Sequence, residues 1–143
     1  MSANPELDAS AEWNLALEDF NRAIKNNLDG DKRNAIIRLY YSAFHAARSL
    51  LIHNDPDFSA RTHQGILRLF SKRFIKEDSL DPEMFAIINE LKNERELAEY
   101  TGDHPGDAIT KNRFEKTYSF LNQIHSTYYS PKKFKKPPDP FDN

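Results

Sequence analysis

The sequence contains no cysteine and only four glycines. The absence of cysteine excludes disulfides and thiolate metal sites, and it fits a reducing compartment. So few glycines leave no room for a glycine-rich phosphate loop or a dinucleotide-binding fingerprint. The histidines show no HExxH motif or other metal-ligand spacing. We therefore expect neither a bound metal nor a cofactor.

Long apolar runs and a strong charge of one sign are also missing. No apolar stretch approaches the roughly 20 residues that cross a bilayer, and the first residues lack the apolar core of a signal peptide. The formal net charge of -2 gives no global attraction to nucleic acid or to an anionic membrane, so any contact with a polyanion has to be local. We expect a cytoplasmic protein that does not bind membranes, and its 143 residues suit one domain.

Apolar side chains recur three and four residues apart in five segments, and no segment alternates with the period of two that marks a strand. Glycine, proline and capping residues separate the segments, which run over 10–27, 32–53, 59–76, 82–100 and 108–129. The pattern predicts an all-α bundle of five helices. The predicted core contains Trp13, Phe20, Leu39, Ala43, Leu50, Phe70, Ile88, Leu91 and Leu121.

The last segment, "SPKKFKKPPDPFDN", differs from the rest in composition. It has four lysines, four prolines and almost nothing to bury, so it cannot offset the entropy lost on ordering. We expect a bundle over residues 1–129 and a flexible, disordered basic and proline-rich tail over residues 130–143. The tail is either a solubilising end or an arm for RNA or a partner.

Arg95 places a charge where the helical pattern of its segment calls for an aliphatic side chain. It lies in the middle of the inward stripe that includes Leu91 and Ala98. A buried guanidinium cannot lose its charge and must find acceptors. Arg95 therefore either pairs with an acid such as Glu99, which fixes the register of the bundle, or belongs to a phosphate-binding site.

A second polar stripe lies on the segment 32–53, away from its apolar face. Its members fall within a sector of about 80 degrees on a helical projection: Arg38, Tyr41, His45 and Arg48. Two guanidiniums that bracket a phenol and an imidazole suit a phosphate or nucleotide, and they equally suit contact with another helix or a second subunit. This stripe predicts a two-fold homodimer in which it lies in or beside the interface.

His63 stands one turn before Ile66 on the inward side of its segment. A single histidine at such a position is more often a hydrogen-bonded core residue than a catalyst. We keep it as a candidate for nucleotide or RNA binding beside the structural interpretation.

Three segments carry the most specific pattern of the chain: "AIIRLYYSAFHAARSLL", "SARTHQGILRLFSKRF" and "INELKNERELAEYTGD". In this order they resemble the small HEPN (higher eukaryotes and prokaryotes nucleotide-binding) domain proteins, in a prokaryotic branch marked by a tyrosine pair followed by Phe-His-Ala-Ala-Arg. The resemblance implies an up-and-down helical bundle that is usually dimeric and often encoded beside a minimal nucleotidyltransferase, in toxin and antitoxin pairs. In several branches the family is a metal-independent ribonuclease.

The ribonuclease motif of the family is an arginine followed, after four to six residues, by histidine. Arg95 matches the arginine, but Tyr100 stands where the histidine would follow after four residues. Arg38 and His45 have the same spacing on a different helix, and His104 follows Arg95 by eight intervening residues, outside the family range. The histidine of the ribonuclease motif is therefore missing after Arg95 at the family spacing.

Two hypotheses of different classes follow. In the first, the chain is an interaction module that acts with a nucleotidyltransferase, and the Tyr100 hydroxyl accepts a nucleotidyl group. In the second, it is a metal-independent endoribonuclease toxin in which Arg95 stabilises the phosphorane and Tyr100, His45 or His104 replaces the missing histidine. We prefer the first, because a tyrosine with a pKa of about 10 is a poor general base at neutral pH.

Overall fold

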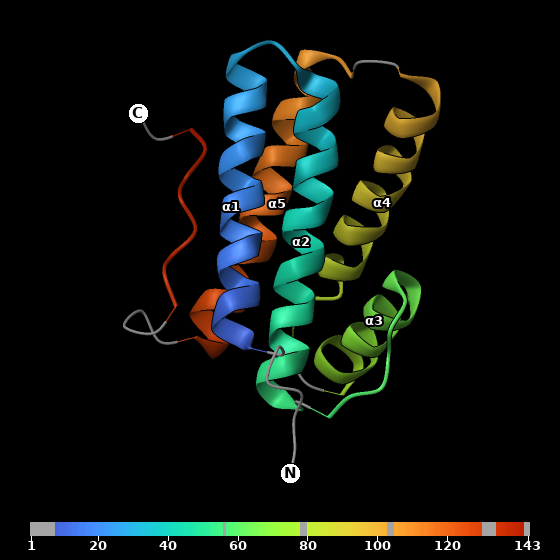
Figure 1. Cartoon of the computed structure of the whole chain (residues 1–143), viewed down its shortest axis with the longest axis vertical. Coiled ribbons are helices and arrows are strands. Elements are labelled where there is room, and N and C mark those ends of the chain that lie inside the picture. Colours follow the sequence, from blue (N-terminus) through green and yellow to red (C-terminus); the bar gives the residue numbers. More distant parts are fainter. Residues whose placement is uncertain (1–7, 56, 78–79, 103–104, 130–133, 142–143) are drawn as a thin grey trace.

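The computed structural model describes residues 8–55, 57–77, 80–102, 105–129 and 134–141, and these residues contain helices but no strand. In chain order the elements are α1 (Ala9–Leu28), α2 (Lys32–Asn54), α3 (His63–Phe70), the π-helix η1 (Ser71–Lys76), α4 (Glu83–Thr101) and α5 (Asp107–Tyr128). The prediction of an all-helical bundle is confirmed. Figure 1 shows α2 in the centre, with α1, α4 and α5 beside it and α3 across its C-terminal end.

The ends of α1 and the start of α2 follow from local chemistry. The Asp8 carboxylate accepts hydrogen bonds from the backbone N–H groups of Ser10 and Ala11 and caps α1. Gly30 has φ +82°, a left-handed conformation that favours glycine, and it ends the helix as the sequence predicts. The Asp31 side chain then accepts from the Asn34 N–H group and caps α2.

The third helix differs from its prediction at both ends. It begins at His63 instead of residue 59, because the Thr62 hydroxyl caps it by accepting a hydrogen bond from the Gly65 N–H group at 3.0 Å. From Ser71 the chain continues as the π-helix η1. Sequence periodicity does not separate the two helix types here, because both keep residues four apart in nearly the same row.

Small side chains let α1 and α2 approach closely. Along α2, the buried residues that face this contact include Ser42 and Ser49, whose hydroxyls donate to the backbone carbonyls of Ala16 (2.7 Å) and Ala9 (2.8 Å). Each hydroxyl is thereby satisfied without a large side chain between the helices. The α1–α2 pair is consequently the most extensive contact of the bundle.

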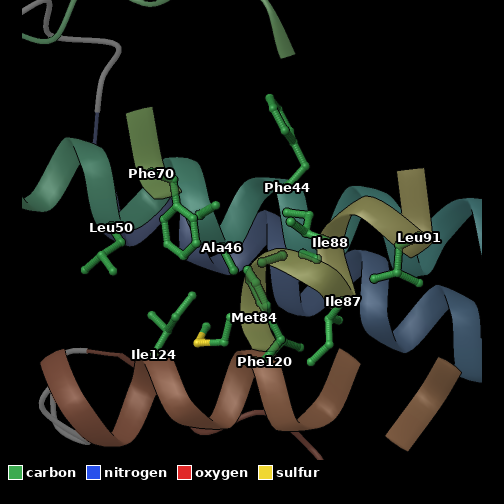
Figure 2. Close-up of a cluster of buried hydrophobic side chains, with 14 of the residues drawn as sticks. Phe44, Ala46, Leu50, Phe70, Met84, Ile87, Ile88, Leu91, Phe120 and Ile124 are labelled. Atoms are coloured by element: carbon green, nitrogen blue, oxygen red, sulfur yellow. The ribbon is translucent and has the colours of Figure 1, made fainter. Parts of the chain in front are cut away.

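Every residue of the predicted core is buried. They join one cluster that draws on all the helices: Trp13, Phe20, Leu39, Ala43, Leu50, Phe70, Ile88, Leu91 and Leu121. Figure 2 shows how Phe70, Met84 and Phe120, from three different helices, point into the same interior. The apolar faces read from the sequence therefore converge on a single core.

The C-terminal tail requires a correction. Residues 134–141 form no helix, but they pack against the bundle, so the expectation of a tail with almost nothing to bury is wrong there. Phe134 is 2% exposed and its ring stacks on Tyr129 at a centroid distance of 3.8 Å. The indole N–H of Trp13 donates to the Lys135 carbonyl oxygen at 2.8 Å, and Nε2 of His125 lies 2.9 Å from the Phe134 carbonyl oxygen. Residues 130–133 and 142–143 lie outside the described residues.

The docked tail generates a stability prediction. Replacing Phe134 with alanine removes a buried ring and loosens the acceptor of the Trp13 indole, so the Tm should fall by about 5 °C or more. Phe141 is 47% exposed in the same segment, and Phe141→Ala is the matched control with little expected effect. Thermal melts followed by circular dichroism measure both, and equal Tm values for the two variants would contradict the docking.

Candidate functional site

Arg95 lies on α4 with its guanidinium against two adjacent aromatic rings of α2. The guanidinium carbon is 4.8 Å from the ring centre of Tyr40 and 5.7 Å from that of Tyr41, and Nη1 donates to the Tyr41 hydroxyl at 3.1 Å. Carboxylate oxygens of Glu99 and Glu96 lie 3.7 and 3.8 Å away. The arginine on an inward stripe is thus held by the faces of two aromatic rings, one hydroxyl and two acids near the upper limit of ion-pair distance.

The side chain of Arg95 is only 16% exposed, yet one of its donors is unused. Burial alone disfavours the charged guanidinium, but the Tyr41 bond and the nearby Glu99 outweigh it, so the pKa of Arg95 is raised above its ordinary value. Its Nε atom is buried and has no hydrogen-bond partner among the described residues. A buried donor without an acceptor is costly, and such a group often marks a place where a ligand acceptor fits.

His63 completes the arrangement from the start of α3. Its Nδ1 lies 2.9 Å from the Tyr40 hydroxyl, and its ring stacks on Phe44 at a centroid distance of 3.9 Å. Burial lowers the pKa of His63, and the positive charge of Arg95 adds to this effect. Burial also raises the pKa of Tyr40 to about 12. Both rings are therefore neutral at pH 7, and we call Tyr40, Tyr41, His63 and Arg95 the Arg95 cluster.

The remaining members of the polar stripe on α2 face α1, where two buried carboxylates receive them. Arg38 Nη1 lies 3.0 Å from Asp19 Oδ1, and Arg48 Nη1 lies 2.8 Å from Glu12 Oε1. His45 Nδ1 lies 2.6 Å from Glu12 Oε2, with Nε2 at 3.8 Å from Asp19. The stripe divides accordingly: Tyr41 joins Arg95, while the three basic residues are paired between helices.

Because these residues are paired within one chain, the polar stripe no longer requires a dimer interface to cover it. A polar stripe was expected to need a second subunit, but Glu12 and Asp19, each 6% exposed, satisfy it within one chain. Glu12, Asp19 and Tyr40 were not among the candidate residues predicted from the sequence. The seven-residue spacing of Glu12 and Asp19, which keeps them on one face of α1, is the signal that could have found them. A homodimer stays a prediction.

Tyr100 stands apart from Arg95. Five residues along a helix correspond to about 140 degrees of rotation, so the two side chains leave α4 in different directions. Tyr100 is 87% exposed, whereas Arg95 is turned toward α2. His104 lies outside the described residues. Of the candidate histidines within the described ranges, His63 shares neighbours with Arg95 and His45 is engaged by the acids of α1.

Among the described residues, no group of three or more histidine, aspartate or glutamate side chains has an arrangement that could hold a metal ion. No helix in the same ranges is long and apolar enough to cross a membrane.

Comparison with known proteins agrees with the family resemblance of the sequence. Residues 10–130 match the family described as the HEPN domain, and because this match covers most of the chain, the chain belongs to the HEPN domain family. No solved structure matches the chain.

Several curated proteins are similar over part of their length. A protein of Methanocaldococcus jannaschii named "Putative toxin" is 34% identical over 70% of this chain and 63% of its own length. A second protein of that organism with the same name is 28% identical over 64% of this chain and 67% of its own. A "UPF0332 protein" of Thermotoga maritima is 27% identical over 59% of this chain and 60% of its own. The chain thus spans less than two thirds of the first of these relatives.

The environment of His63 generates a pH prediction. Because burial lowers its pKa in the folded chain, the unfolded chain takes up the proton first as the pH falls below about 6.5. The free energy of unfolding should therefore decrease from that pH down to the folded pKa, and His63→Asn should remove this part of the decrease. Urea denaturation at a series of pH values measures it.

The control for this measurement is His53→Asn, because His53 is exposed on the last turn of α2. We expect this control to keep the pH slope of the unchanged chain. Identical slopes for the unchanged chain and His63→Asn would show that the imidazole does not titrate differently on folding.

Proposed function

We propose that this chain is a toxin-type HEPN protein that acts as an interaction module with a nucleotidyltransferase partner. Membership of the HEPN family and the toxin names of two relatives support the toxin class. The resemblance stated above supplies the class of partner, because HEPN proteins of this kind are often encoded beside a minimal nucleotidyltransferase.

The observation that carries the proposal is the exposure of the Tyr100 hydroxyl. Of the six tyrosines, Tyr100 alone is exposed, and its exposed fraction is 87%. It lies near the end of α4. A side chain that enters the active site of another protein has to protrude in this way. Gly102, with φ +72°, ends the helix just beyond it and leaves the ring at the rim of the bundle.

The chemistry proposed at Tyr100 is a nucleotidyl transfer. The phenolic oxygen attacks the α-phosphorus of a nucleoside triphosphate, a new P–O bond forms, and the bond to the pyrophosphate group breaks. The phenolic proton passes to a base of the partner, and pyrophosphate leaves. The charged phosphate on Tyr100 would then alter which surfaces this end of the bundle contacts.

Tyr100→Phe tests this reaction, because it deletes only the acceptor oxygen. The full chain is incubated with a minimal nucleotidyltransferase of the proposed partner class and a labelled nucleoside triphosphate, and the intact mass is measured. We expect one nucleotidyl group on the unchanged chain and on the control Tyr118→Phe, and none on Tyr100→Phe. Modification of Tyr100→Phe, or an unmodified natural chain, would refute the proposal.

A second candidate function is metal-independent RNA cleavage by the Arg95 cluster. The observation in its favour is that Arg95, with an unused Nε donor, and the neutral His63 share Tyr40 and Tyr41 as neighbours. When Nδ1–H of His63 donates to the Tyr40 oxygen, Nε2 keeps a lone pair that accepts a proton.

In that reaction His63 removes the proton of a ribose 2′-hydroxyl, whose oxygen attacks the adjacent phosphorus. The bond to the 5′-oxygen of the next nucleotide breaks, this oxygen takes up a proton from water and leaves as a 5′-hydroxyl, and a 2′,3′-cyclic phosphate forms. Arg95 stabilises the negative charge of the phosphorane.

Arg95→Met keeps the length of the stem and removes the charge, so it separates a catalytic site from a scaffold. If the cluster cleaves RNA, Arg95→Met and His63→Asn should each reduce cleavage of a fluorogenic RNA by about 100-fold or more. EDTA should have no effect. Arg22→Met, at an exposed position on α1, is the control and should keep full activity. Equal cleavage by all variants would exclude this site.

A further inference from the structure

A groove of about 960 Å³ lies between the α3–η1 segment and the first part of α4. In Figure 1 these elements lie beside each other at the end of the bundle away from the α1–α2 loop. The apolar side chains that line the groove include Leu67, Ile75 and Phe85. Phe85 is 42% exposed, so a large aromatic surface is left without cover in the groove.

Four cations surround this apolar floor: Arg68, Lys72, Lys76 and Lys92. The first three are spaced by four residues along the α3–η1 segment, which keeps them in one row. Lys92 lines the groove from α4. Among the described residues that line the groove, Glu77 is the only acidic one.

Unlike several arginines elsewhere in the bundle, the four groove cations have no acidic partner within ion-pair distance among the described residues. Arg38, Arg48, Arg73 and Arg113 each lie within ion-pair distance of a carboxylate. Within the described ranges none of the four groove cations does. In a chain whose formal net charge is -2, four unpaired positive charges around one groove form a local surface that attracts anions.

The combination of an apolar floor and a cationic rim fits one kind of occupant best. A single-stranded nucleic acid would need successive aromatic rings on which to stack its bases. Within the described part of the chain, Phe85 is the only aromatic side chain that lines the groove. An amphipathic helix instead places aliphatic residues on the floor and acidic residues against the rim. We propose that the groove binds an acidic amphipathic helical segment of a partner protein.

The proposal goes beyond the function proposed above and does not depend on it. Phe85 and Tyr100 are separated by fifteen residues of α4, which corresponds to about 22 Å along the helix. Groove binding therefore leaves the Tyr100 hydroxyl accessible, and either proposal can fail without the other.

The test uses the full chain and a fluorescein-labelled peptide of about 18 residues, long enough for five helical turns. Leucines three and four positions apart form one face of the probe and glutamates form the rest. One comparison peptide has the same composition in an order that mixes the two faces, and a second carries lysine in place of glutamate. A short labelled single-stranded RNA completes the panel, and fluorescence anisotropy measures each Kd.

We expect the chain to bind the segregated acidic peptide and neither comparison peptide. Lys72→Glu combined with Lys92→Glu should raise the Kd by about tenfold or more, because each reversal repels a glutamate. Phe85→Ala should raise it by about threefold or more through loss of the apolar contact. Added salt should weaken binding of the unchanged chain more than that of the charge-reversed variant.

Arg22→Glu combined with Lys136→Glu is the matched control, because it reverses two exposed cations outside the groove. This control should keep the Kd, and thermal melts should show that all variants are folded. The proposal would be overturned if the acidic peptide did not bind or if the mixed-order peptide bound equally well. It would also be overturned if the control changed the Kd as much as the groove variant does. RNA binding that the groove substitutions weaken while the peptide does not bind would overturn it as well.

Discussion

A charge that leaves water has to be compensated inside the bundle, and this constraint organises both polar faces of α2. Toward α1, the buried carboxylates of Glu12 and Asp19 receive the basic residues of the stripe. Toward α4, the rings of Tyr40 and Tyr41 receive the guanidinium of Arg95. The central helix therefore makes polar contacts in two directions while its apolar face fills the core.

The two kinds of compensation leave the basic side chains with different capacities to bind a ligand or take part in a reaction. The carboxylates of α1 form short ion pairs with Arg38 and Arg48, so these cations serve to hold α1 against α2. The aromatic rings attract Arg95 without accepting its Nε hydrogen, so one donor stays unused beside a neutral imidazole. This difference is why the Arg95 cluster, and not the stripe as a whole, is the candidate for chemistry.

The structure shows how Tyr100, which stands in place of the histidine of the family motif, is placed relative to Arg95. A tyrosine five residues after Arg95 points away from it and into solvent, which suits a hydroxyl that another protein reaches. At the other end of α4, the unpaired cations of the groove offer a separate surface to a partner. These two features are the basis of the two interactions proposed for this chain.

The sequence by itself determined the helices, most of their ends and the core, because these follow from local patterns. The period of apolar residues, the caps at Asp8 and Asp31 and the left-handed Gly30 all act within a few residues. It also singled out Arg95 as a charge that needed an explanation, and it marked the polar stripe on α2.

Only the tertiary structure decided what these charges meet. The helical period shows which residues share a face, but it does not say which face of a neighbouring helix lies opposite. The pairing of His45 with Glu12 and the contact of Arg95 with Tyr40 could therefore not be predicted from the sequence. The docking of Phe134 could not be predicted for the same reason. A segment with one buried ring looks disordered by composition, and its docking also depends on the carbonyl oxygen of Lys135, which accepts from Trp13 far away in the chain. Contacts between residues distant in sequence carry this information, and local pattern does not contain it.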